Sequence, residues 1–425
     1  MKPKQTAALL FSLFLLLFLF LSPLGCGSSS ENTIPGTDGT TTTTSGSDPA
    51  SGGTTTTASS GSLPGSTAES LVTTTVTFST TTQTIATSSG TFVVRNIDYA
   101  GNVVGNIYSS IAIDSNNYAH ISCYDRANSD LKYLYGQGSS WTKTIIANAG
   151  NIGQFTGMAV DTNNNPYISF YSPASGALDY GFKVGGVWFY ASVDDPASGA
   201  DVGYFSSIVT DSLGFLHICY YDWNGEDLKY ATNNSGGWTS EIVDGAASSV
   251  GKYCAIAVDS GNTLHISYYD NTNNQLKYAT GTRGHWATEA IDSIILLTQQ
   301  NTSIAVATDN TVYISYFNEG AQTLRIAYGK AGDWAKQLID SNNVGLNNSI
   351  AVDSSKNLYV AYSDLTNSAL KYAYKGSADA LWTKSTIDNS ASVGQDCSLA
   401  LDSSNKPHIC YYDATNYLLK YAVMQ

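Results

Sequence analysis

The stretch LHICYYDWNGEDLKY at residues 216–230 decides the fold, because close copies of it recur along the chain. The copies are AHISCYDRANSDLKY at 119–133, LHISYYDNTNNQLKY at 264–278 and PHICYYDATNYLLKY at 407–421. A phrase that returns at a regular interval marks a repeated structural unit. Its period therefore defines the architecture.

A small apolar run that ends in aspartate, such as SIAID at 110–114, precedes each copy and fixes the period. We call the last residue of each run the anchor position. The anchors, one of which is an alanine, are Asp114, Asp161, Asp211, Asp259, Ala307, Asp353 and Asp402. They are 46–50 residues apart, so the chain contains seven units.

Each unit contains four short segments that are typical of β-strands. The anchor run is followed by a polar turn, the HISYYD phrase, the LKYA phrase, and a segment that opens with tryptophan and ends near Ile-Asp. The tryptophans are Trp141, Trp188, Trp238, Trp286, Trp334 and Trp382. β-Branched and aromatic runs between Gly, Asn and Asp turns indicate strands, and no long stretch has helical spacing. Four antiparallel strands per repeat of this length match a β-propeller blade.

The two ends of the repeat predict how the ring closes. The last unit stops at Gln425, before a tryptophan segment of its own. FVVRNID at 92–98 supplies that segment, since Phe92 stands in the tryptophan position and Asp98 follows six residues later, as in other units. An N-terminal strand in the C-terminal blade removes two exposed sheet edges. We therefore predict an all-β, seven-bladed β-propeller over residues 91–425, closed by its N-terminal strand.

The chain begins with the layout of an export signal over residues 1–26. MKPKQ is basic, the following run is apolar, and small residues precede Cys26. Gly25 and Cys26 also fit a bacterial lipoprotein signal, in which the cysteine carries the lipid, whereas Pro23 does not fit. We predict lipidation of Cys26; an ordinary cleaved signal or an uncleaved anchor is the alternative.

Residues 27–90 are mostly Thr, Ser and Gly. Such a segment cannot bury enough apolar surface to offset its ordering entropy, so we predict a disordered tether. Within it, the alternating stretch at 71–82 favours a local strand. Signal, tether and ring together predict an exported protein of the cell envelope that faces outward and meets the membrane only through its N-terminal anchor.

The formal net charge of −14 limits the partners. Nucleic acids and anionic lipids bind basic surfaces, so we expect neither as a partner. No motif points to a cofactor. We expect a monomer whose charge contributes to solubility.

Four histidines stand six residues after their anchors: His120, His217, His265 and His408. Tyrosine fills this position in the other units, so we expect a packing or hydrogen-bonding role. One histidine per blade cannot converge on a metal ion, and turns such as DSNN offer too few carboxylates for calcium. We predict no metal site and assign the anchor aspartates to Asx turns.

Five cysteines follow Cys26. In a hairpin centred on residues 403–404, Cys397 and Cys410 would face each other, and an exported protein could form a disulfide there. Since Ser, Thr or Ala fill these positions in most units, small buried side chains at a tight sheet contact are the alternative.

The aspartate of YYD lies seven residues before the lysine of LKY in five units. The pairs are Asp125 with Lys132, Asp222 with Lys229, Asp270 with Lys277, Asp364 with Lys371 and Asp413 with Lys420. The second unit has Ser172 and Asp179 at these positions. Because both members change together, we expect an ion pair across the hairpin between the second and third strands.

The loops after YYD emerge on one face of the ring and offer aromatic rings beside carboxylates. Sugar recognition uses this combination, since rings stack on apolar sugar faces while polar groups bind hydroxyls. The candidate ligand-binding residues are Tyr124, Asp125, Tyr221, Asp222, Trp223, Tyr269, Asp270, Tyr412 and Asp413. The alternative, which does not extend to Trp223, is that the tyrosines pack between blades.

The YYD…LKY…W rhythm of residues 91–425 resembles the repeats of bacterial exported propellers grouped with sialidase-like (BNR-type) repeats, and it is similar in layout to propeller lectins. The resemblance implies a propeller that binds or acts on sugars. The Asp-box of sialidases, Ser-x-Asp-x-Gly-x-x-Trp, is not present as such, and the ring has four scattered arginines where sialidases cluster three: Arg95, Arg126, Arg283 and Arg325.

We therefore expect no catalytic residues and no cofactor. The predicted function is a surface-displayed binding propeller whose loop face holds a glycan or a partner protein. A sialidase-like glycoside hydrolase or lyase is one alternative, and a structural spacer is another.

Overall fold

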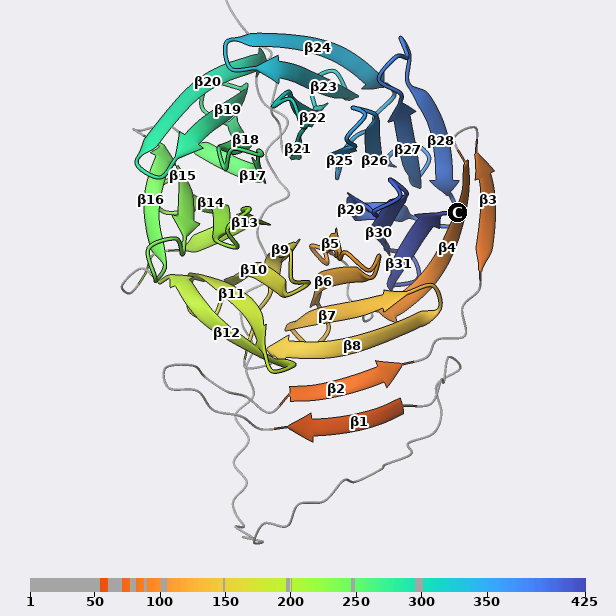
Figure 1. Cartoon of the computed structure of the whole chain (residues 1–425). Helices are drawn as coiled ribbons and strands as arrows, with labels where there is room; N and C mark the ends of the chain where they lie inside the picture. The colour runs from red at the N-terminus through yellow and green to blue at the C-terminus, as the bar shows by residue number, and fades with distance from the viewer. Residues whose placement is uncertain are drawn as a thin grey trace, which may run out of the picture. The chain divides into compact units, whose positions relative to one another are not determined.

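Every unit of the repeat folds into an antiparallel sheet built on four strands, and the seven sheets stand around one axis as propeller blades (Figure 1). This computed structural model describes residues 54–59, 71–76, 82–87, 90–100, 105–147, 150–195, 199, 201–245, 249–294 and 301–425. Within these ranges all regular structure is β-strand. No helix in the described part of the chain is long and apolar enough to cross a membrane.

The blades follow each other in chain order, and the first strand of each lies nearest the axis (Figure 1). Blades 1 and 2 consist of β5 (Ser110–Ile113), β6 (Ala119–Asp125), β7 (Asp130–Gln137), β8 (Ser140–Ala147), then β9 (Gln154–Val160), β10 (Pro166–Ser172), β11 (Ala177–Val184) and β12 (Val187–Asp194). Blades 3 and 4 consist of β13 (Val202–Thr210), β14 (Leu216–Asp222), β15 (Asp227–Thr232), β16 (Thr239–Asp244), then β17 (Val250–Val258), β18 (Leu264–Asp270), β19 (Gln275–Thr282) and β20 (His285–Ser293). Blades 5 and 6 consist of β21 (Thr302–Val306), β22 (Val312–Asn318), β23 (Thr323–Lys330), β24 (Asp333–Asp340), then β25 (Ser349–Val352), β26 (Leu358–Asp364), β27 (Ala369–Lys375) and β28 (Thr383–Asp388).

Blade 7 closes the ring as predicted. It combines β29 (Val393–Leu401), β30 (Pro407–Asp413) and β31 (Leu418–Met424) with the N-terminal strand β4 (Gly90–Tyr99). β4 pairs antiparallel with β31, Phe92 opposite Met424 and Asp98 opposite Leu419. The seven-bladed, all-β architecture with an N-terminal closing strand is thereby confirmed.

Three further strands precede β4. β1 (Thr54–Ser59) and β2 (Leu71–Val76) extend blade 1 through pairing of β2 with β8, and β3 (Gln83–Thr87) extends blade 7 through β4. The export signal at 1–26, Cys26 and the rest of the predicted tether lie outside the described residues.

The apolar core lies between blades, because alternate residues of each inner strand face the neighbouring sheet. One cluster, for example, joins Cys219 and Tyr230 of blade 3 to Ile256, Ile266 and Tyr268 of blade 4. Another joins the closing strand to blades 7 and 1 through Ile97, which is fully buried. Neighbouring blades therefore share their cores, so the burial of each blade's apolar residues depends on the blades beside it.

A repeated polar group, which we call the junction triad, links the outer strands of neighbouring blades. The aspartate that ends one blade accepts a lysine ammonium of the next blade's third strand and a tyrosine hydroxyl of its second strand. At one junction, Asp388 lies 2.5 Å from Lys420 Nζ and 2.7 Å from the Tyr411 hydroxyl. The other complete triads are Asp194–Lys229–Tyr220, Asp244–Lys277–Tyr268 and Asp340–Lys371–Tyr362.

The predicted ion pair within the hairpin is confirmed in three of the five units, but in four of the five the shorter contact of the lysine is to the junction aspartate of the preceding blade. Lys132 does contact Asp125 at 2.7 Å, but elsewhere the hairpin aspartate is farther, as in the 3.9 Å from Lys420 to Asp413. Blade 2 has Asp179 in place of the lysine. Its junction partner is also absent, because blade 1 ends in Ala147 where the other blades end in aspartate. The paired change thus reports a contact between blades.

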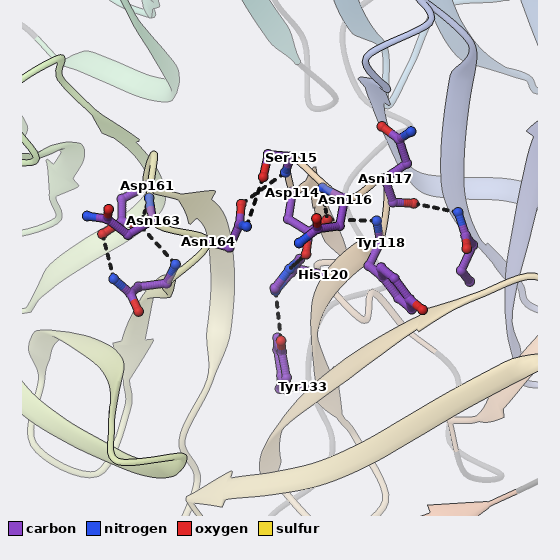
Figure 2. A network of polar contacts seen from close by, with 12 residues as sticks. Asp114, Ser115, Asn116, Asn117, Tyr118, His120, Tyr133, Asp161, Asn163 and Asn164 are labelled. Atoms are coloured by element: carbon purple, nitrogen blue, oxygen red, sulfur yellow. Dashed lines mark hydrogen bonds and ion pairs between the residues drawn. The ribbon is translucent and has the colours of Figure 1, made fainter.

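The anchor turns link the blades near the axis (Figure 2). Asp114 Oδ1 accepts the backbone N–H groups of Asn116 and Tyr118 at 2.9 and 2.8 Å, as an Asx turn does. Asn164 of blade 2 accepts the N–H of Ser115 of blade 1 at 3.0 Å. The same bond joins Ser403 N–H of blade 7 to Asn117 of blade 1 at 3.0 Å, so the turns also close the circle.

The four histidines hold strands together, as predicted. His265 Nδ1 lies 2.6 Å from the Tyr278 hydroxyl, and its Nε2 lies 3.4 Å from Asp259. His120 makes the same contacts with Tyr133 and Asp114 (Figure 2). Burial lowers the pKa of all four imidazoles, although their aspartates oppose the shift.

Candidate functional site

A cavity of about 380 Å³ opens where the innermost strands begin. Its wall includes the residue six positions before each anchor: Tyr108, Phe155, Phe205, Tyr253, Asn301, Asn347 and Asp396. We call these residues the cavity ring. Equivalent residues of all seven blades meet only around the axis, so the cavity is central.

The backbone turns the cavity ring towards the axis by leaving regular strand geometry. Six of its seven residues adopt a left-handed conformation, for example Phe205 at φ 56° and Asp396 at φ 47°. The register between first and second strands shifts at the same place, between Tyr204 and Ser207 in blade 3. A bulge re-aims side chains in this way, and non-glycine residues at positive φ cost roughly 1 kcal/mol or more each. The surrounding structure must hold this strain.

A closed belt of hydrogen bonds supports the cavity ring. In each blade, the side chain five positions before the anchor donates to the backbone carbonyl of the ring residue in the preceding blade. The donors and acceptors are Ser109 to Asp396, Thr156 to Tyr108, Ser206 to Phe155, Cys254 to Phe205, Thr302 to Tyr253, Asn348 to Asn301 and Cys397 to Asn347. Their lengths are 2.5–3.3 Å. Neutral hydroxyl, thiol and amide donors thus fix the inner wall.

This belt also corrects the proposed disulfide. All five cysteines of the ring are free thiols and buried. Cys410 stands opposite Ser398 in the sheet register, because the hairpin is centred on Ser404 and not between residues 403 and 404 as the prediction required. Cys397 donates to Asn347 instead, and Cys410 lies 3.6 Å from the Ser109 hydroxyl. Burial raises the pKa of Cys410 to about 12, so it stays a thiol at neutral pH.

One half of the cavity ring is aromatic. Tyr108, Phe155, Phe205 and Tyr253 come from four consecutive blades, and the centroids of neighbouring rings are 4.4, 4.8 and 4.1 Å apart. The rings support one another and form a continuous apolar wall. Such packed rings are rigid, which lowers the entropy lost when a ligand binds.

The other half of the cavity ring is polar. Asn301 and Asn347 provide amides, and Asp396 provides the one carboxyl group of the described cavity lining. Asp396 Oδ2 accepts the backbone N–H groups of Ile107 and Tyr108 at 2.6 and 3.1 Å. Burial raises the pKa of Asp396 to about 6, against these amides and nearby Arg126. At neutral pH the group is largely a carboxylate that can accept ligand hydroxyls.

The tyrosines predicted to bind ligand lie inside the protein. Tyr124, Tyr221, Tyr269 and Tyr412 are at most 3% exposed. The Tyr124 hydroxyl donates to Asn151 at 2.7 Å, and that of Tyr269 donates to the backbone carbonyl of Asn301 at 3.1 Å. These side chains pack between blades directly behind the cavity ring.

The predicted aspartates serve the loops in which they stand. Asp125, Asp270 and Asp413 are buried, and Asp222 is partly buried. Each accepts backbone N–H groups of its own turn, as Asp222 does from Asn224 and Gly225 at 3.1 and 2.8 Å. They fix loop geometry and have no contact with one another around the face.

Trp223 differs from the other predicted residues because half of its surface, 50%, is exposed. Its ring packs on Tyr204 with centroids 5.1 Å apart. Tyr204 in turn lies 5.3 Å from Phe155 of the cavity ring. Ring contacts thus join Trp223 to the cavity, as they do the buried Tyr124, Tyr221 and Tyr269, but Trp223 is the exposed member of this set.

The predicted set did not include the cavity ring, although the sequence carried a signal for it. Reading the position six before the anchor through all units gives aromatic residues in four consecutive blades and Asn or Asp in the next three. A position that holds packing alone would keep one residue type. The distribution of residue types over the repeats could therefore have pointed to the axis.

The structure does not assemble a sialidase centre from its arginines. Arg126 is near Asp396, whereas Arg95 lies in β4, Arg283 in the β19–β20 turn and Arg325 in β23. Among the described residues, no three His, Cys, Asp or Glu side chains gather as metal ligands.

Comparisons with known proteins show that this chain is similar in fold to several solved structures. No family model and no curated protein matches the sequence. Similar solved structures include a lectin from Aleuria aurantia (13% identity, 68% of this chain and 98% of that one, TM-score 0.47) and a Hadza microbial sialidase (8%, 73% and 73%, 0.49). A gluconolactonase from Xanthomonas campestris is also similar (11%, 83% and 97%, 0.43). At these values, nothing about ligand or activity follows for this chain.

Proposed function

We propose that the protein is a non-catalytic binding propeller that holds a carbohydrate in its central cavity. The observation that carries this proposal is the division of the cavity ring into an aromatic half and a half of amides and a carboxylate. Sugars have the same two-sided character, because their C–H faces are apolar and their hydroxyls need hydrogen bonds.

The sequence of the N-terminus adds a location to this proposal. An export signal and lipidation at Cys26 would display the ring outside the cytoplasm, where free glycans and glycan coats occur. The long Thr/Ser/Gly segment would let the ring extend away from the membrane.

Hydrolysis of a glycosidic bond is less well supported. Glycosidases generally use two carboxyl groups that flank the bond. Asp396 is the one carboxyl group in the described lining, and its raised pKa has a structural cause in burial. Binding without turnover fits this lining better than catalysis does.

The test is a glycan array probed with the purified protein, followed by calorimetry with the glycans that bind. Phe205→Ala removes a central aromatic ring and Asn347→Ala removes an amide; each should weaken binding about 10-fold, the equivalent of one aromatic or hydrogen-bond contact. Tyr118→Ala is the matched control, since Tyr118 is an exposed, stacked ring in an anchor turn away from the cavity.

Two results would contradict the proposal. One is the absence of any bound glycan, and the other is unchanged affinity in both cavity variants. Chromogenic glycosides provide the complementary measurement: turnover that disappears in Asp396→Asn would establish an enzyme instead.

A further inference from the structure

Blade 3 carries two aromatic residues at positions that are not aromatic in any other blade. Trp223 directly follows the aspartate of the second strand, and Tyr204 stands seven residues before the anchor. In the six other units, neither position holds Phe, Tyr or Trp. The two exceptions therefore coincide in one blade, and in space the rings touch.

The two rings continue the aromatic half of the cavity outward. From Phe155 in the cavity ring, centroid distances of 5.3 Å to Tyr204 and 5.1 Å from Tyr204 to Trp223 define a connected track. The last ring is the exposed one, at 50%. The track therefore runs from the cavity to the loop surface of blade 3 and ends on an open platform.

Hydrogen bonds hold the track in place without covering its end. The Trp223 backbone N–H donates to the carbonyl of Asp201 at 2.8 Å. The Tyr204 hydroxyl donates to that of Tyr171 at 3.1 Å, and Tyr171 donates to the Asp201 carboxylate at 2.8 Å. Lys252 Nζ lies over the Trp223 ring, 5.4 Å from its centroid, and adds a cationic hydrogen-bond donor to this end of the track.

A half-exposed tryptophan on a fixed backbone is a stacking platform for the apolar face of a sugar ring. We propose that Trp223 forms an outer subsite and that the ligand is an oligosaccharide, with one unit in the central cavity and a further unit on Trp223. This inference rests on the proposed carbohydrate function and adds the length and direction of the ligand.

The experiment measures affinity as a function of chain length. Malto-, cello-, chito- and xylo-oligosaccharides of one to six units are titrated into the purified wild-type protein, Trp223→Ala, Trp223→Phe and the control Tyr118→Ala. In the series that binds, affinity of the wild type should rise in a step once the chain is long enough to reach Trp223. Trp223→Ala should remove that step, about 5- to 10-fold, and leave the shortest binding sugar unaffected, while Trp223→Phe should retain part of it.

The outcomes separate the two proposals. Binding that is independent of length, or weakened equally at every length by Trp223→Ala, overturns the outer subsite but leaves the cavity as the binding site. If no series binds to the wild type while the thermal melt shows a folded protein, both proposals fail for these sugars. If the thermal melt shows that Trp223→Ala is unfolded, Trp223→Phe replaces it as the test: a reduced affinity step supports the outer subsite, and an unchanged step overturns it.

Discussion

The outer junctions keep the same residue types in most blades, whereas the inner cavity ring changes its residue types from blade to blade. At the junctions, nearly the same Asp, Lys and Tyr return from blade to blade, with 2.5 Å between Asp and Lys in each complete triad. Around the cavity, the backbone conformation returns but the side chains change from aromatic to polar. Repetition therefore holds the ring together, and the departures from repetition give it a site.

The charges of the two regions fit this division. The junction aspartates are enclosed and paired: burial alone would raise the pKa of Asp388, but Lys420 and hydrogen bonds from Ser390 and Tyr411 lower it below its usual value. The belt behind the cavity uses neutral donors, and the lone carboxyl of Asp396 has a raised pKa. Paired charges thus lie where blades join, whereas the cavity has a single carboxyl group whose pKa is raised to about 6.

The largest effect should follow from deleting β4, which tests whether closure carries the stability. The deletion removes Phe92 and Ile97, both fully buried, and exposes the edge of β31. We expect no cooperatively folded monomer by circular dichroism and size-exclusion chromatography. Deleting β3 is the control, since β3 is a half-exposed edge strand whose described partner is β4. A β4 deletion that melts like the wild type would refute the closed ring.

Next in size should be the loss of a junction aspartate. Asp388→Ala leaves the buried Lys420 with Asp413, 3.9 Å away, as its nearest carboxylate; loss of a buried ion-pair partner typically costs about 3–5 kcal/mol of unfolding free energy. Denaturant titration measures the change. Asp309→Ala removes an equally short ion pair with Lys356 that is exposed to solvent, and its stability should remain within error of the wild type. Equal losses in both variants would show that burial at the junctions has no special weight.

The histidines should give a smaller, pH-dependent effect. Because burial lowers the pKa of His265 while an unfolded histidine titrates near 6.5, the unfolded chain takes up more protons as the pH falls below about 6.5. The histidine contribution to stability is thus present at pH 7 and lost towards pH 5. His265→Tyr, the residue found in other blades, should flatten this part of the curve.

The measurement is the difference in melting temperature between His265→Tyr and the wild type at each pH. Asp130, Asp179 and Asp396, with pKa values raised to about 6, change stability in the opposite sense and cancel in the difference. The variant also leaves the Tyr278 hydroxyl without its histidine, so it should be less stable at pH 7. An unchanged pH profile would show that the imidazole is protonated equally in both states.

The smallest effect should come from the thiols. Cys397→Ser keeps a donor to the Asn347 carbonyl, as Thr and Ser do in other blades, so stability should change by less than about 1 kcal/mol. Reductant should leave the melting temperature of the wild type unchanged, because Cys397 and Cys410 are not bonded. A melting temperature that drops in reductant would restore the disulfide.

Much of the fold could be predicted because it is written in local, repeated signals. The spacing of the anchors gave the number of blades, and Phe92 and Asp98 in the tryptophan and aspartate positions gave the closing strand. The partner of each lysine could not be obtained in this way. Asp413 stands in the same hairpin as Lys420, whereas Asp388 ends the preceding blade. The packing of one blade on the next makes Asp388 the nearer partner, at 2.5 Å against 3.9 Å.

The sequence by itself determined the β-strand repeat, its count and its closure, because alternation and turn residues act over a few neighbours and then recur. Tertiary structure alone decided which side chains face the axis: bulges between the first and second strands of four blades, and left-handed residues in six, turn the cavity ring inward. A shift of one residue exchanges the two faces of a strand, so the buried tyrosines and the residues of the cavity wall cannot be told apart until the blades are packed.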